Sequence, residues 1–218
     1  MKLIDFWKDK DASSKKYSFI EYAYDSYLGN FLKTIKGMSS SEATRFVIDE
    51  TEKGHIEKAS KYAHVLLRHG EFYINIASPY YGEKFVREHE IANSLNLTTF
   101  PFLIEWFITA GGDMIIVTRI PGNTGQNIND RLSYSIANMR NEVSDLAKQN
   151  VIRELKMLES HGYLVDPKFR YCVRMNDDGR IIIPHFPLIP VEEVKSRTSD
   201  RFLKEIYGRY SMFGNYLE

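Results

Sequence analysis

The chain has 218 residues, and its 29 lysines and arginines balance its 29 aspartates and glutamates, so the formal net charge is zero. A general nucleic-acid binder usually carries a basic excess, because the neutralisation of phosphates drives its affinity, and an acidic disordered tail shows the reverse. Both classes are therefore disfavoured. Hydrophobic residues make up 43% of the chain, which is enough to build a core in one large domain or two small lobes.

The cysteine content and the apolar runs of the sequence bear on the cellular compartment of the protein and on whether it spans a membrane. The lone cysteine, Cys172, excludes an intrachain disulfide framework and a multi-cysteine zinc site. The first residues are charged where a cleaved signal peptide needs an apolar stretch. The longest apolar stretch, near Phe100–Ile108, contains Glu105 and falls short of the roughly 18 residues of a membrane span. We expect a soluble globular protein without a membrane span, located in the cytoplasm or secreted without a cleaved apolar signal.

The first fifty residues predict one or two short helices. The residues that recur at the three- to four-residue spacing of a helix face are Phe19, Tyr22, Ala23 and Tyr27. Ser39 and Glu42 have the spacing of a capping box, which would start a second helix.

From Gly54 the hydrophobic period shortens to that of strands. His69-Gly70 is a short turn between two such runs, which predicts a hairpin. The expected elements are, in order, a hairpin of 62–68 and 71–77, a break at 78–82, a helix at 83–95, and strands at 102–107 and 113–119 around a glycine-rich turn at 110–113.

Pro121-Gly122 begins a cluster of helix- and strand-breaking residues, which we interpret as a boundary between lobes. The remaining expected elements are a long helix at 135–160 ended by His161-Gly162, a hairpin of 171–175 and 180–183, irregular chain around three prolines at 184–190, and a helix at 191–207. A strand-rich first half and a helix-rich second half predict an α+β architecture. We divide it into a helical extension at 1–50, a β-rich lobe at 51–121 and a helical lobe at 122–218.

Three segments together resemble the protein-kinase fold. They are Ile115-Ile-Val-Thr-Arg-Ile-Pro-Gly122, similar to the strand and hinge between kinase lobes; Leu158-Glu-Ser-His-Gly-Tyr-Leu-Val-Asp166-Pro-Lys168, similar to the catalytic loop; and Asn176-Asp-Asp-Gly-Arg-Ile-Ile-Ile-Pro-His185-Phe186, similar to the hairpin leading into Asp-Phe-Gly. The match is one of order and spacing, with degenerate motifs. The most similar subgroup is the small kinase-like effectors that pathogenic bacteria inject into host cells. The resemblance implies a two-lobed fold with a small β-rich N-lobe and a truncated helical C-lobe, because only about 31 residues follow Pro187.

The resemblance assigns chemical roles to two residues. Asp166 takes the position of the aspartate that orients the attacking hydroxyl, and Lys168 that of the lysine beside the transferring phosphate. Simpler interpretations stand beside these roles: Asp166 precedes a proline and suits a turn, and Lys168 suits a solvated surface.

Three other positions depart from the family. Tyr171 replaces the metal-binding asparagine, His185 replaces the aspartate of Asp-Phe-Gly, and Asn75 replaces the strand lysine that pairs with phosphate. Neither a phenol nor a neutral imidazole is a good magnesium ligand. On the following helix, Glu88 and Glu90 are the implied partners of the missing lysine.

These losses favour a pseudokinase that acts by binding a protein partner. We expect no nucleic-acid partner and assign no metal site. Asn75, Tyr171 and His185 disfavour the binding of ATP and magnesium. Two alternatives stay open. The first is a divergent active kinase or nucleotidyl transferase of the effector type that uses Asp166 and Lys168, with Lys58 or Lys61 in place of the strand lysine. The second is a non-kinase interaction domain with a similar order of elements.

Overall fold

The fold is described from a computed structural model of the chain. The structure describes residues 14–16, 24–58, 65–122, 143–166, 174–175, 179–184, 186–197, 207–208 and 210. They divide into two compact units, which are described separately: residues 1–86 with 103–118, and residues 87–102 with 119–218. The mixed α+β class predicted from the sequence is confirmed.

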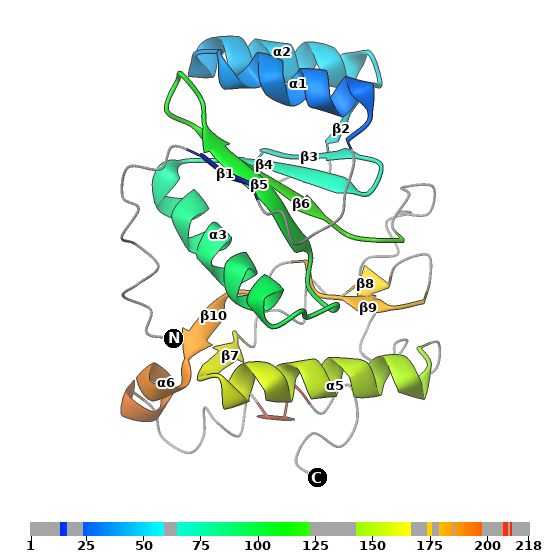
Figure 1. The fold of residues 1–218 in the computed structure, drawn as a ribbon, viewed down its shortest axis with the longest axis vertical. Coiled ribbons are helices and arrows are strands. Elements are labelled where there is room, and N and C mark those ends of the chain that lie inside the picture. The colour runs from blue at the N-terminus through cyan, green and yellow to red at the C-terminus, as the bar shows by residue number, and fades with distance from the viewer. Residues whose placement is uncertain are drawn as a thin grey trace. The chain divides into compact units, whose positions relative to one another are not determined.

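The first unit is built on a six-stranded antiparallel sheet (Figure 1). In sheet order the strands are β1 (Ser14–Lys16), β5 (Phe102–Ile108), β6 (Met114–Arg119), β4 (Phe72–Ala77), β3 (Val65–His69) and β2 (Glu57–Lys58). The predicted hairpin is confirmed for β3 and β4, where Val65 lies opposite Ile76 and His69 opposite Phe72. Gly70 makes the turn with a φ of 56°, a conformation that glycine adopts without strain. Strand β1 was not predicted.

Two helices, α1 (Ser26–Lys36) and α2 (Ser40–Glu52), belong to the same unit and lie side by side in Figure 1. The Asp25 side chain caps the start of α1, and the predicted capping box of Ser39 and Glu42 starts α2. The helices meet where Phe31 stacks on Phe46, with ring centroids 5.2 Å apart. One or two short helices were predicted in the first fifty residues, and there are two; the first begins at Ser26, near the end of the pattern that predicted it, and residues 17–23 of that pattern lie outside the described residues.

The β5–β6 turn is fixed against the α1–α2 connection. Ala110 N donates to Lys36 O, and Gly111 N donates to Met38 O, both at 3.0 Å. A side chain at Gly111 would collide with the backbone of Ser39 and Ser40, so only glycine permits this approach. The predicted turn at 110–113 is thereby confirmed, and it has a docking role that the sequence did not indicate.

Helix α3 spans Pro79–Ser94, and the division between the two units falls within it, after Val86. The predicted break at 78–82 was wrong. Proline is well tolerated at the first position of a helix, where its missing N–H has no intrahelical partner, and Gly82 N already donates to Ser78 O at 2.9 Å. In the first unit, Val86 packs with Leu103, Met114 and Ile116 of the sheet.

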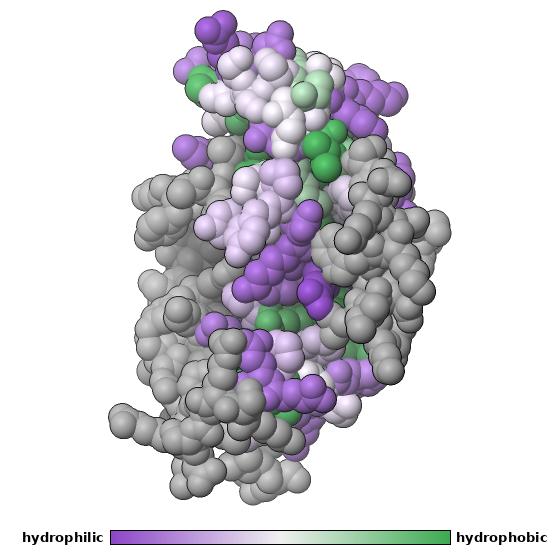
Figure 2. Space-filling view, turned by 90° about the vertical axis from the view of Figure 1, so that its left-hand side faces the viewer, coloured by the Kyte–Doolittle hydropathy of each residue, from purple (hydrophilic) through white to green (hydrophobic). Residues whose placement is uncertain are grey.

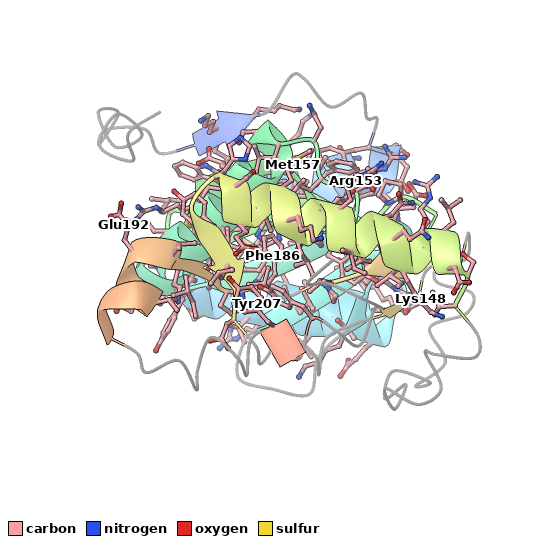
Figure 3. All side chains as sticks on the ribbon, turned by 90° about the horizontal axis from the view of Figure 1, so that it is seen from below. Lys148, Arg153, Met157, Phe186, Glu192 and Tyr207 are labelled. Atoms are coloured by element: carbon pink, nitrogen blue, oxygen red, sulfur yellow. The ribbon has the colours of Figure 1, made fainter. Side chains whose placement is uncertain are left out.

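The second unit contains helices α5 (Asp145–Ser160) and α6 (Val191–Arg197) and two short sheets, β7 (Tyr163–Val165) with β10 (Leu188–Pro190) and β8 (Arg174–Met175) with β9 (Ile181–Ile182). Its core joins the apolar face of α5 to these strands and to Phe186 (Figure 3). The predicted hairpin of 171–175 and 180–183 is confirmed by the β8–β9 pair, while its turn residues 176–178 lie outside the described residues.

Two predicted boundaries in this unit need correction, and a third falls on residues outside the description. The long helix ends at Ser160 as expected, but α5 begins only at Asp145, because Ser144 caps it; residues 135–142 lie outside the described part. The chain at 184–190 is not wholly irregular: Leu188–Pro190 forms β10, where Pro190 ends the strand. The last helix is described as α6 only to Arg197, and residues 198–206 lie outside the description.

The described surface carries few large exposed hydrophobic residues, which are Ile48, Tyr80, Tyr81, Leu146 and Met157. On the face drawn in Figure 2, the coloured residues are mostly purple or pale, and the green ones occur in small separate groups. Among the helices described, none is long and apolar enough to cross a bilayer.

Candidate functional site

The second half of α3 carries buried polar side chains. Glu88, His89 and Glu90 are each at most 7% exposed. Because successive residues of an α-helix point about 100° apart, three consecutive buried residues mean that this part of α3 is enclosed on more than one face. Buried polar groups of this kind are retained where they make hydrogen bonds, so their contacts indicate what this part of the second unit holds in place.

Glu88 and Asp166, two residues predicted for the site, hold the same peptide group. Glu88 Oε1 accepts a hydrogen bond from Leu188 N at 3.0 Å, and Asp166 N donates to Pro187 O at 2.8 Å. The Pro187 carbonyl and the Leu188 N–H belong to one peptide unit, so both of its polar ends are bound. We call this arrangement the peptide clamp. It fixes the chain directly after Phe186.

Phe186, the residue before the peptide clamp, is the aromatic centre of the unit. It is 1% exposed, and its ring lies 4.5 Å from the His89 ring and 4.4 Å from the Phe100 ring, centroid to centroid. It also packs in the core that contains Leu155 and Leu158 of α5 (Figure 3). Tilted aromatic pairs at such distances contribute about 0.5–1.5 kcal/mol beyond the area that they bury.

Glu154, which the sequence analysis did not single out, anchors the loop after α3. This residue of α5 is 3% exposed; its Oε1 accepts from Thr98 N and Thr98 Oγ1 at 2.9 and 2.8 Å, and its Oε2 accepts from Thr99 N at 2.7 Å. Ile183 N donates to Thr99 O at 2.7 Å, so the hairpin of β9 is tied to the same loop. The sequence did contain a signal that Glu154 is buried, because this residue shares the helical phase of the apolar Val151, Leu155 and Leu158.

Asp166 itself lies half-buried just after β7. The strand before it is held by Tyr210, which is 1% exposed and whose hydroxyl accepts from Val165 N at 2.8 Å and donates to Val165 O at 3.0 Å. Burial raises the pKa of Tyr210 well above its usual value, so the hydroxyl keeps its proton. The predicted partners Lys168, Tyr171 and His185 lie outside the described residues.

Asn75 belongs to the first unit, in β4, opposite Leu66 of β3. Its side-chain oxygen Oδ1 is buried and accepts no hydrogen bond from the described residues. A neutral amide at this position supplies no cation. Of the two alternative lysines, Lys58 is exposed in the short strand β2, and Lys61 lies outside the description.

The described part of the chain holds no group of three or more histidine, cysteine, aspartate or glutamate side chains arranged to bind a metal ion. The chemistry visible there is hydrogen-bonded positioning of backbone: the peptide clamp, the Glu154 anchor and the Tyr210 contact all bind main-chain groups.

Comparison with known proteins adds little. No protein-family model matches the chain, and no curated protein sequence matches it. Among solved structures, the 2.2 Å crystal structure of WbdD aligns with 71% of this chain at 14% sequence identity and a TM-score of 0.38. The aligned part is 37% of the WbdD chain. A likeness this weak leaves the kinase-like fold a proposal.

Proposed function

We propose that this chain is a kinase-like protein that does not transfer phosphate and acts by binding a protein partner. The observation that carries the proposal is the use made of Glu88. The resemblance would pair this helix carboxylate with a strand lysine, and Asn75 takes that lysine's place. Glu88 instead accepts a hydrogen bond from Leu188 N in the peptide clamp. A carboxylate serving as a backbone acceptor stabilises the fold and needs no nucleotide.

The resemblance to injected effectors suggests a partner in a host cell. Tyr171 and His185 support the same function, because each stands where the resemblance requires a magnesium ligand. Phosphoryl transfer depends almost wholly on positioning and charge stabilisation, so the loss of two metal ligands and a phosphate cation would leave little catalysis.

One observation favours the second candidate, a divergent active kinase or nucleotidyl transferase that uses Asp166 and Lys168. Asp166 and Pro187 are 21 positions apart in the sequence, and the resemblance sets them beside one active site; they are joined by a 2.8 Å hydrogen bond. A site assembled in this way could orient a hydroxyl group if metal were held by other residues.

Thermal unfolding with ATP, with and without Mg²⁺, separates the two candidates. We expect no magnesium-dependent rise in Tm, because a ligand stabilises a fold only through binding to it. Asp166→Asn tests the alternative, and Asp145→Asn, at an exposed aspartate of the same unit, is the matched control. A magnesium-dependent shift and transfer of labelled phosphate, both lost in Asp166→Asn but kept in Asp145→Asn, would overturn the proposal.

Binding of a protein partner is tested by a separate measurement. A host-cell protein that co-purifies with the wild-type chain should bind Asp166→Asn with the same Kd in isothermal titration calorimetry, since binding does not require that carboxylate. A Kd that changes on adding ATP and Mg²⁺ to the wild-type chain alone would count for catalysis.

A further inference from the structure

A polar cluster in the first unit has no part in the proposed function. Its centre is His69, the last residue of β3, whose two ring nitrogens both contact oxygen atoms. Nε2 lies 2.5 Å from Asp25 Oδ2, and Nδ1 lies 3.1 Å from the backbone oxygen of His55. Asp25 is the cap of α1, and His55 follows α2, so one imidazole joins the start of one helix and the end of another to the β3–β4 hairpin.

Both oxygen atoms that face His69 can only accept hydrogen bonds. The His55 carbonyl has no proton to give. The Asp25 carboxyl is bound through its other oxygen, because Oδ1 accepts from Leu28 N at 2.7 Å. Burial acts to raise the pKa of Asp25, but the hydrogen bonds from Leu28 and His69 outweigh it and hold that pKa below its usual value, so the group is a carboxylate at neutral pH. Only an imidazole with a proton on each nitrogen can donate to both acceptors.

The surrounding charged groups complete the cluster. The Tyr27 ring lies 5.0 Å from the His69 ring, and the Tyr27 hydroxyl donates to Glu50 Oε2 at 2.7 Å. Glu50 also contacts Lys53 Nζ at 2.8 Å and His55 Nδ1 at 3.1 Å. Arg68, the preceding residue of β3, is paired with Glu57 of β2.

Those neighbours fix the local charges. Hydrogen bonds from Lys53, Tyr27 and His55 lower the pKa of Glu50 to about 2. Burial, and then the bond to Glu50, raise the pKa of Tyr27. Glu50 therefore stays anionic and Tyr27 neutral near pH 7, and His69 is the member of the cluster whose second proton decides whether both of its contacts are made.

We propose that His69 is a pH-sensitive latch that fastens helices α1 and α2 to the β3–β4 hairpin in its doubly protonated form. When the ring loses one proton it can donate to one acceptor only, so either the Asp25 cap or the His55 backbone is released. The side chain of His69 is 23% exposed, so solvent can exchange the proton without unfolding the unit. The proposal is independent of any kinase-like function.

The sign of the pH dependence follows from which form the fold binds. The doubly protonated ring makes both contacts, and a ring that has lost one proton makes only one, so the latch is fastened at lower pH and released as the pH rises. Protonation of Asp25 removes the same contact at the acid end, because its pKa is lowered in the folded state. The latch is therefore strongest in a window that is bounded on both sides.

Two measurements on the wild-type chain test the latch. Imidazole ¹⁵N chemical shifts report the protonation of each ring nitrogen, and below pH 6 we expect His69 to show protons on both. Hydrogen exchange at Gly29 N–H, which donates to Asp25 O in the first turn of α1, reports release of the Asp25 side, and exchange at His55 N–H, which donates to Glu50 O after α2, reports release of the His55 side. After correction for intrinsic exchange, opening at one of these two amides should increase about tenfold from pH 6 to pH 8.5, as loss of one charge-assisted hydrogen bond implies.

The variant His69→Gln should remove this pH dependence, because an amide does not titrate. The matched control is His161→Gln, at an exposed histidine of the second unit, which should leave the dependence unchanged. A neutral-tautomer pattern for His69 below pH 6, or opening that is constant with pH at both the Gly29 and the His55 amides of the wild-type chain, would overturn the proposal. Both results come from the unmodified protein, so the test does not depend on the variant folding.

Discussion

At the scale of single residues, two buried carboxylates of the second unit act as acceptors for backbone N–H groups. Glu88 binds Leu188 N, and Glu154 binds the N–H groups of Thr98 and Thr99. A carboxylate can accept several bonds at once without offering a proton, so it suits a loop whose N–H groups would otherwise be buried without partners. From the sequence, Glu88 was predicted to be the partner of a strand lysine, and Glu154 was not singled out, because only the fold brings its backbone partners to it.

Replacement of Glu154 tests this role. Glu154→Gln places an NH₂ group against backbone donors, so at least one buried N–H loses its acceptor, and we expect the free energy of unfolding to fall by about 1–3 kcal/mol. Urea denaturation measures the change. Glu192→Gln, at an exposed glutamate of the same unit, should stay within about 0.5 kcal/mol of the wild type. Equal stability of the two variants would mean that the Thr98–Thr99 loop does not depend on the carboxylate.

At the scale of elements, the sequence predicted those whose signals are local. The capping box of α2, the β3–β4 hairpin and the 110–113 turn each depend on neighbouring residues, and each was predicted correctly. Strands β7 and β10 were missed because three-residue strands show almost no alternation, and their pairing joins residues more than twenty positions apart. The peptide clamp was equally out of reach: the sequence suggested Glu88 and Asp166, but only the fold brings them to one peptide group.

The β5–β6 turn offers a test at this scale. Gly111→Ala would push a methyl group into the backbone of Ser39 and Ser40, which cannot move without disturbing the cap of α2, so we expect a loss of about 1–3 kcal/mol in unfolding free energy. Gly29→Ala is the matched control, because the added Cβ meets nothing within 4 Å inside α1 and should stabilise by up to about 1 kcal/mol. Thermal unfolding of both variants decides, and a tolerated Gly111→Ala would contradict the docking role.

At the scale of the whole molecule, lowered carboxyl pKa values make the stability of the first unit depend on acid. Asp25, Glu42 and Glu50, all in this unit, have pKa values below their usual ones. A carboxyl group whose pKa is depressed in the folded state stabilises the fold above its unfolded pKa, and the contribution is lost as the pH falls through the folded value.

The first unit should therefore lose stability in acid. For Glu50 the loss runs from about pH 4.5 down to about pH 2, since its folded pKa is about 2. Hydrogen exchange followed by mass spectrometry at pH 7, 4 and 3 should show α1 and α2 losing protection as the pH falls. Glu50→Gln should reduce the acid sensitivity of α2, and Glu52→Gln, on the exposed side of the same helix, should not. Unchanged protection of α1 and α2 at pH 3 would argue against the assignment.

The Tyr210 hydroxyl has a consequence for the polar groups of β7. Val165 is fully buried, and a buried N–H or carbonyl without a hydrogen-bond partner costs free energy. By engaging both the N–H and the carbonyl of Val165, this phenol occupies the hydrogen-bonding positions that a third strand of the β7–β10 sheet would fill. One aromatic side chain thus substitutes for a neighbouring strand at this position, and the high pKa of its hydroxyl keeps the donated bond across the whole physiological pH range.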